Sequence, residues 1–134
     1  MKIILDTNVL ASGIFFPGVP LRILQGIKQG KYSTVVTSDI VDEYKRTITK
    51  LANDFPGVDA TAQLELFVVS SEICQPKILV NPVCEDPDDD KFIACAIASK
   101  TKIIVSGDKH LLKISGYQNV RVLKPRAFSD RYLR

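Results

Sequence analysis

The sequence has few of the residues that build disulfide frameworks, zinc sites or serine-type active sites. Its 134 residues include three cysteines, one histidine and no tryptophan. Cys74, Cys84 and Cys95 are too few and too widely spaced for a disulfide framework or a zinc site, so we expect reduced, mostly buried thiols. Because there is one histidine and no G-x-S-x-G motif, Ser-His-Asp chemistry is not expected. P-loop, dinucleotide-binding and HExxH motifs are also missing.

Long hydrophobic runs and low-complexity segments are missing too. The longest mostly apolar stretches, such as residues 9–16, fall far short of the roughly 20 residues that span a bilayer. No signal peptide is recognisable, so we expect no membrane association and a cytoplasmic location. A hydrophobic content of 46%, with seven glycines and seven prolines, excludes disordered and collagen-like classes. The length is typical of one domain, and we expect a single domain over residues 1–134.

Segments of strand and helix character alternate along the chain. Short aliphatic or β-branched runs predict strands, and apolar residues recurring every three or four positions predict helices. The expected strands are residues 2–5, 33–37, 73–80, 102–105 and 120–123. The expected helices are residues 8–16, 21–29, 40–51, 60–69, 91–99 and 111–114, and a basic tail follows residue 123. This alternation predicts an α/β fold with a mainly parallel, five-stranded sheet flanked by helices (α/β/α).

Acidic residues recur where ligands bind in such folds. Asp6 and Asp108 directly follow two expected strands, and Glu43 lies on the helix after the second strand, off its apolar stripe. Residues 85–90 (EDPDDD) hold five acids at the start of a helix. Each acid also has a structural alternative, as a helix cap or a first-turn residue; Asp86 followed by Pro87 is a good helix start. The joint pattern indicates more, because such positions can converge at one edge of a parallel sheet.

Four carboxylates in one crevice repel each other unless their pKa values rise or a cation joins them. Oxygen ligands without cysteine or histidine suit Mg²⁺ or Mn²⁺. Such a site is typical of two-metal phosphodiester hydrolysis, in which the ions lie about 3.5–4 Å apart.

Four segments resemble, in order, the motifs of the PIN-domain family, and more narrowly the VapC-like toxin components of bacterial and archaeal toxin–antitoxin pairs. Residues 1–10 (MKIILDTNVL) are similar to the family's opening strand and DTN motif, and 38–43 (SDIVDE) to its helix with an acid. Residues 88–94 (DDDKFIA) resemble its central acidic helix start, and 106–112 (SGDKHLL) its T/S-G-D motif with a leucine pair.

The resemblance implies a single PIN-like domain that hydrolyses RNA with a metal-activated water. It implies one or two Mg²⁺ or Mn²⁺ ions as cofactors, a homodimer, and a cognate antitoxin that blocks the site. Asn8 and Ser106 would support the site by hydrogen bonding. The implied catalytic and metal-binding carboxylates are Asp6, Glu43, Asp90 and Asp108.

One position departs from the family pattern. Related sequences often carry another acid two residues after the T/S-G-D aspartate, where this chain has His110. His110 is either a contact to a phosphate or a surface residue. Asp88 and Asp89 are candidates to replace the missing acid.

The net charge of +3 is the sum of unlike parts. Residues 121–134 carry five basic residues and one acid, hence +4, so the first 120 residues, with thirteen basic and fourteen acidic residues, sum to −1. Lys45 and Arg46 on the helix of Glu43, and Lys109 beside Asp108, are candidate contacts for an RNA backbone. The alternative for all of them is a solvated surface.

Other interpretations stay open. The same scaffold suits a nuclease of RNA processing or DNA metabolism, or an inactive module that binds metal or nucleic acid. A phospho-receiver domain fits poorly, because the early acid is single and the late strand ends in Asp108 where that class needs a lysine. A phosphohydrolase with a nucleophilic aspartate fits poorly because Asn8 stands where its second acid is expected.

Overall fold

Strands and helices alternate within residues 1–79 and 81–133, which the computed structural model describes. Helices are labelled α, and short 3₁₀ helices η. The elements are β1 (Lys2–Leu5), α1 (Thr7–Phe15), α2 (Val19–Lys28), β2 (Ser33–Val36), α3 (Ser38–Ala52), α4 (Ala60–Val69), β3 (Glu72–Ile73), η1 (Pro87–Asp89), α5 (Asp90–Ser99), β4 (Ile103–Val105), α6 (Lys109–Lys113), η2 (Tyr117–Asn119), β5 (Arg121–Leu123) and α7 (Pro125–Tyr132).

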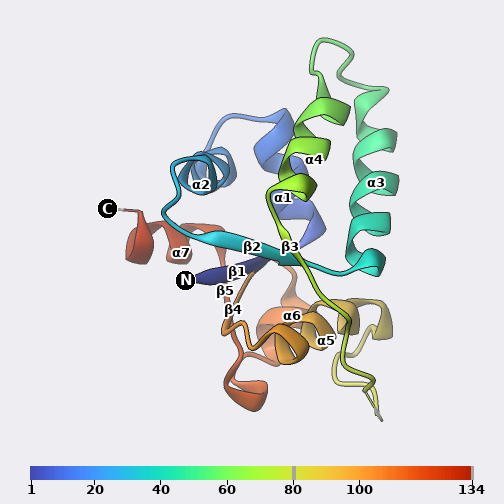
Figure 1. Cartoon of the computed structure of the whole chain (residues 1–134), viewed down its shortest axis with the longest axis vertical. Coiled ribbons are helices and arrows are strands. Elements are labelled where there is room, and N and C mark those ends of the chain that lie inside the picture. Colours follow the sequence, from blue (N-terminus) through green and yellow to red (C-terminus); the bar gives the residue numbers. More distant parts are fainter. Residues whose placement is uncertain (80, 134) are drawn as a thin grey trace.

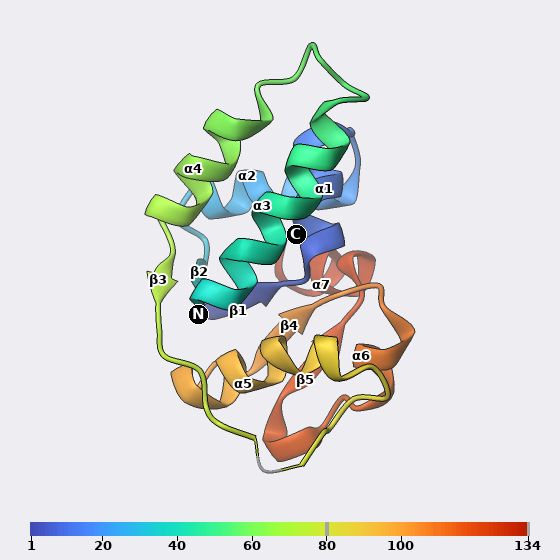
Figure 2. The ribbon, with the colours of Figure 1, turned by 90° about the vertical axis from the view of Figure 1, so that its right-hand side faces the viewer.

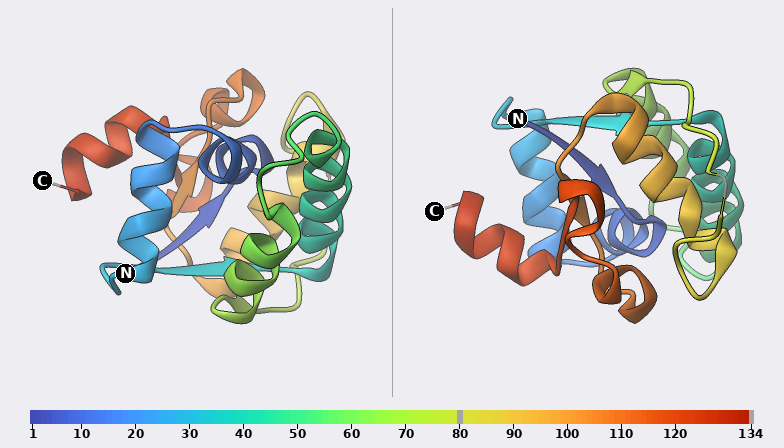
Figure 3. Two further views of the ribbon diagram at one scale, coloured as in Figure 1. Left: turned by 90° about the horizontal axis from the view of Figure 1, so that it is seen from above. Right: turned by 90° about the horizontal axis from the view of Figure 1, so that it is seen from below.

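The strands of the described residues form a five-stranded sheet in the order β3-β2-β1-β4-β5, and all four pairings are parallel. Helices α1 to α4 lie on one side of the sheet and α5 and α6 on the other (Figures 1 and 2). Views from above and below show α3 beside α4 and α2 beside α7 (Figure 3). The predicted α/β/α architecture is therefore confirmed.

Strand β1 lies in the middle of the sheet, and its side chains are part of the core. Ile3, Ile4 and Leu5 are all fully buried, because helices cover both faces of the sheet. Buried parallel strands read as continuous apolar runs of this kind. The cysteines are free thiols, with Cys84 and Cys95 buried and Cys74 half-buried, as expected. In the described part of the chain, no single helix is long and apolar enough to cross a membrane. Helices α1 and α2 reach that length and hydropathy only when taken together, and a 92° bend separates them.

The third strand is much shorter than predicted. Of the expected range 73–80, the structure has only Glu72–Ile73 as β3, and Val80 lies outside the described residues. Pro76 accounts for the early end, because it has no N–H to continue the ladder. Beyond it the Lys77 amide donates to the Ala94 carbonyl of α5 at 3.2 Å.

The expected basic tail is largely a helix. Pro125 occupies the first turn of α7, a favoured position because a helix leaves that N–H unpaired. Phe128 is fully buried and packs edge-on against Tyr32, with ring centroids 5.1 Å apart. The prediction was wrong because the basic composition masked this apolar anchor. Arg134 lies outside the described residues.

Candidate functional site

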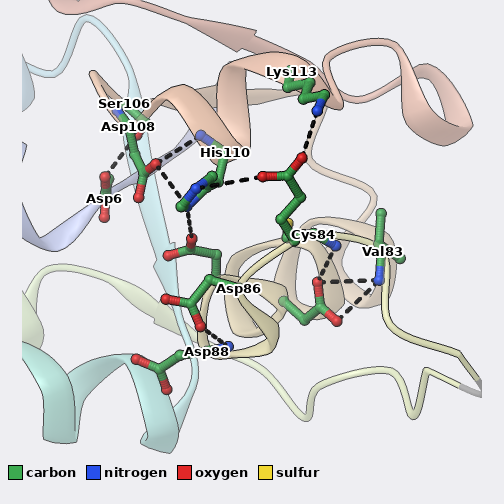
Figure 4. Close-up of polar contacts among 12 residues, drawn as sticks. Asp6, Val83, Cys84, Asp86, Asp88, Ser106, Asp108, His110 and Lys113 are labelled. Carbon is green, nitrogen blue, oxygen red and sulfur yellow. Dashed lines mark hydrogen bonds and ion pairs between the residues drawn. The ribbon is translucent and has the colours of Figure 1, made fainter.

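The carboxyl ends of β1 and β4 bring two predicted site residues together. Leu5 pairs with Val105 in the parallel register, and the Asp6 amide donates to the Val105 carbonyl at 3.0 Å. Asp6 and Asp108 therefore leave neighbouring strands at one edge of the sheet, where open α/β sheets bind ligands. Figure 4 shows the two side chains close to each other there.

Ser106 joins the two acids. Its hydroxyl donates to Asp6 Oδ2 at 2.6 Å and accepts the Asp108 amide at 2.9 Å. Ser106 is fully buried, so water does not compete for these bonds. The hydroxyl holds the Asp6 carboxylate and the start of α6 in a fixed relation, in keeping with the supporting role that the resemblance implies.

The Asp6 carboxylate caps the helix that follows it and lies in surroundings that disfavour its charge. Asp6 caps α1, its Oδ1 accepting the Thr7 amide at 2.7 Å, and only 5% of the residue is exposed. Burial raises the pKa of Asp6; the bonds from Ser106 and Thr7 oppose this, and the charges of Asp108 and Glu43 add to it. A cation nearby would favour the ionised form of Asp6 and offset the effect of burial.

Glu43 reaches the same edge from α3. The hydroxyl of the adjacent, fully buried Tyr44 donates to the Leu5 carbonyl, which ties α3 to the end of β1. Glu43 Oε2 accepts the Thr7 hydroxyl, and Oε1 accepts Lys91 Nζ at 2.7 Å. Both oxygens of Glu43 are thus engaged.

Lys91 is a site residue that sequence reasoning missed. Its ammonium lies 2.7 Å from Glu43 and 3.1 Å from Asp88, and its side chain is 13% exposed. Burial alone would lower the pKa of Lys91, but the bonds to Glu43 and Asp88 outweigh it and raise the pKa. The Asp88–Lys91 spacing on a helix start was visible in the sequence. The contact with Glu43 was not, because it depends on how α3 packs against α5.

Asp89, expected only as a supporting residue, lies at the centre of the acidic group. Its Oδ2 is the one buried side-chain polar atom among the described residues that lacks a hydrogen-bond partner. Burial, and then the charges of Asp108, Asp86 and Asp6, raise the pKa of Asp89 to about 6, while His110 lowers it. An orphaned, buried carboxylate oxygen facing other carboxylates indicates the position of a cation.

The Asp90 carboxylate is engaged elsewhere. It accepts the Val83 amide at 3.1 Å and the Cys84 amide at 2.8 Å. These bonds fasten the loop before η1 to the first turn of α5. Asp86 caps η1 as predicted, its carboxylate accepting the Asp88 amide at 3.0 Å. The structure therefore brings Asp6, Glu43, Asp89 and Asp108 together and gives Asp90 a backbone-binding position.

The remaining predicted residues lie at the rim. His110 is half-buried beside Asp89 and Asp108. Asn8, Lys45, Arg46 and Lys109 are exposed, and within residues 1–79 and 81–133 their side chains make no hydrogen bond. Nothing in the fold opposes contact of the three basic residues with a phosphate backbone, but nothing orients them either.

The donor set fits a divalent cation. Carboxylate oxygens dominate, as Mg²⁺ and Mn²⁺ prefer. Asp86, Asp89 and His110 each offer an atom, and these atoms lie within 4.8 Å of one another. Asp6 and Asp108 flank them, and the unpartnered Asp89 Oδ2 has a lone pair free to coordinate. The residues present thus suit metal-assisted chemistry on an anionic substrate.

Comparison with known proteins finds similar sequences and a similar fold. A family profile described as PIN domain matches residues 2–110. An uncharacterized protein of Methanocaldococcus jannaschii is 35% identical over 118 residues, which are 85% of this chain and 75% of that protein. Among solved structures, the crystal structure of VapBC2 from Rickettsia felis, bound to a DNA fragment from its promoter, is similar in fold. The TM-score is 0.61 at 15% identity, over 92% of this chain and 98% of the other.

Proposed function

Because this chain belongs to the PIN-domain family, which indicates a nuclease, we propose that it is a Mg²⁺- or Mn²⁺-dependent endoribonuclease and the toxin component of a toxin–antitoxin pair. The observation that carries the proposal is the convergence of Asp6, Asp89 and Asp108 at one sheet edge, with a buried oxygen of Asp89 left unpartnered. Burial and neighbouring charges raise the pKa values of Asp6 and Asp89, and a cation beside these carboxylates would offset both effects.

Asp6, Asp89 and Asp108 would hold the ion, with Glu43 completing the set. A divalent ion there would supply a water of lowered pKa as nucleophile and neutralise charge on the phosphodiester. The chain's own contribution is to keep the carboxylates in place. Ser106 fixes Asp6, and Lys91 with Thr7 fixes Glu43. This differs from the assignment that the resemblance implied, in which Asp90 was the third carboxylate.

The substrate and partner assignments are part of the same proposal. Exposed Lys45, Arg46 and Lys109 would hold the RNA backbone on either side of the carboxylates. The likeness in fold to a chain of the VapBC2 complex supports an antitoxin partner, which would cover this edge. A homodimer and a cytoplasmic location complete the proposal.

Metal removal tests the reaction. Purified protein should cleave RNA in Mg²⁺ or Mn²⁺, leave DNA of the same sequence intact, and lose all cleavage when EDTA is added. The matched control is Asp42→Asn, an exposed acid on α3, which should cleave like the wild type. Full activity in EDTA would contradict the mechanism, and equal cleavage of DNA would favour a role in DNA metabolism. Metal binding without any cleavage would favour an inactive module.

Expression in cells tests the toxin assignment. The wild-type chain should arrest growth, because uncontrolled RNA cleavage stops translation. Asp6→Asn, expressed to the same level, should be harmless, and co-expression of a cognate antitoxin should relieve the arrest. A wild type that cleaves RNA in vitro but leaves growth unaffected would instead indicate a housekeeping nuclease.

A further inference from the structure

The His110 imidazole lies among acidic groups without being hydrogen-bonded to them. Its Nδ1 is 3.6 Å from Asp89 Oδ2 and 3.7 Å from Asp108 Oδ1. Both distances exceed a hydrogen bond, and the Asp89 oxygen is the unpartnered one. Figure 4 shows the ring turned from α6 toward the acidic loop. His110 also belongs, with Asp86 and Asp89, to a group of side chains whose ligand atoms all lie within 4.8 Å of one another, and Asp108 adjoins this group on the Nδ1 side.

The other ring nitrogen faces a carboxylate, at a distance that also exceeds a hydrogen bond. Nε2 lies 3.7 Å from Glu85 Oε2, and Glu85 is itself paired with Lys113 at 2.5 Å. Histidines that bind metals usually direct their second nitrogen toward a carboxylate or carbonyl, which fixes the tautomer and leaves the first nitrogen free to coordinate. Glu85 is the carboxylate on the Nε2 side of His110 and would take this role once an ion is bound at Nδ1.

We propose that His110 Nδ1 is a ligand of the ion held by Asp89 and Asp108, and that this nitrogen makes the site select a first-row transition ion such as Mn²⁺ over Mg²⁺. The inference rests on the proposed function and adds the selectivity of its metal centre. Mg²⁺ favours an all-oxygen octahedron, whereas imidazole nitrogen suits transition ions. The side chain is 31% exposed, so an ion can reach Nδ1 from solvent.

Pulsed electron paramagnetic resonance of bound Mn²⁺ tests the proposal directly. His110 is the only histidine in the chain, so an imidazole ¹⁴N coupling can come from no other residue. The wild type should show this coupling. The variant His110→Asp, which offers only oxygen, should bind Mn²⁺ without the coupling, and its Mn²⁺-to-Mg²⁺ affinity ratio, measured by competition, should fall. A melting curve of His110→Asp verifies that it is folded.

The Glu85→Gln variant is the matched control. It should keep the ¹⁴N coupling and lose about tenfold in Mn²⁺ affinity, the low end for loss of an outer-shell carboxylate. Bound Mn²⁺ without ¹⁴N coupling in the wild type, or an unchanged ion preference in His110→Asp, would overturn the inference. EDTA-sensitive RNA cleavage would survive that result, so the proposed function would stand. A wild type that binds no divalent ion would contradict both.

Discussion

Replacing Asp89 with asparagine is expected to abolish RNA cleavage while leaving the fold intact. The Asp89 carboxylate would be lost from the centre of the acidic group, where its Oδ2 is free to coordinate. Turnover should fall by at least about 100-fold, because loss of an outer-shell group alone costs about 10–100-fold in metal affinity or activity. Initial rates at saturating Mg²⁺, with Asp42→Asn as control, measure this. Turnover within a few-fold of the wild type would show that Asp89 is not a ligand.

The same variant should stabilise the protein in EDTA. Because the folded state raises the pKa of Asp89 from 3.8 to about 6, it binds the proton more tightly than the unfolded chain does. Wild-type stability therefore falls as pH rises between these values, and the loss persists at neutral pH. Asparagine carries no charge, so the variant should melt a few degrees higher at neutral pH, a gain on the order of 1 kcal/mol. The gain should vanish as the pH approaches about 4.

Replacing Asp90 with asparagine is expected to lower stability and to preserve most of the activity, the opposite of the Asp89 variant. The Asp90 carboxylate accepts two backbone amides, those of Val83 and Cys84, and an asparagine cannot accept through both of its terminal atoms. Loss of such bonds costs about 1–3 kcal/mol, so Asp90→Asn should melt several degrees lower than the wild type, with or without metal. Below its melting temperature its turnover should fall far less than that of Asp89→Asn. Thermal melting and initial rates on the same sample measure both.

The opposite outcome has a definite meaning. An Asp90→Asn variant that melts like the wild type but is inactive, beside an active Asp89→Asn, would show that Asp90 is the ligand, as the family resemblance implies. The two neighbouring substitutions remove the same charge from adjacent positions, so charge alone cannot explain a difference between them.

The strand-end acids are easier to place from the sequence than the acids of the loop before α5. Asp6 and Asp108 could be placed because each directly follows a short buried run, and parallel strands end at one edge of a sheet. That β1 and β4 are neighbours is a property of the topology, which no local pattern encodes. Consecutive residues around a helix start point in directions about 100° apart. Three aspartates in a row therefore do not reveal which one lies under the influence of Asp108; in the structure the charge of Asp108 raises the pKa of Asp89.

The other gaps have similar causes. Lys91 was overlooked because its contact with Glu43 joins α3 to α5, and sequence spacing gives no information about that packing. Helix α7 was overlooked because basic residues surround Phe128, although Pro125 followed by an apolar residue three positions on is a helix-start signal. The third strand was predicted too long because the residues beyond Pro76 are apolar. A proline has no N–H to donate to the neighbouring strand, so the strand ends before it.

Binding of Mn²⁺ to the wild type and to Asp6→Asn, followed by calorimetry, tests the central claim most directly. The claim is that Asp6, Asp89 and Asp108 together hold the divalent ion on which cleavage depends. Asparagine fits the space of the almost fully buried Asp6 but replaces one of its two acceptor oxygens, which bind the Thr7 amide and the Ser106 hydroxyl, so a melting curve verifies that the variant is folded at the binding temperature. Saturable binding in the wild type that is lost in Asp6→Asn is the predicted result. Equal Mn²⁺ affinity in the two proteins would contradict it.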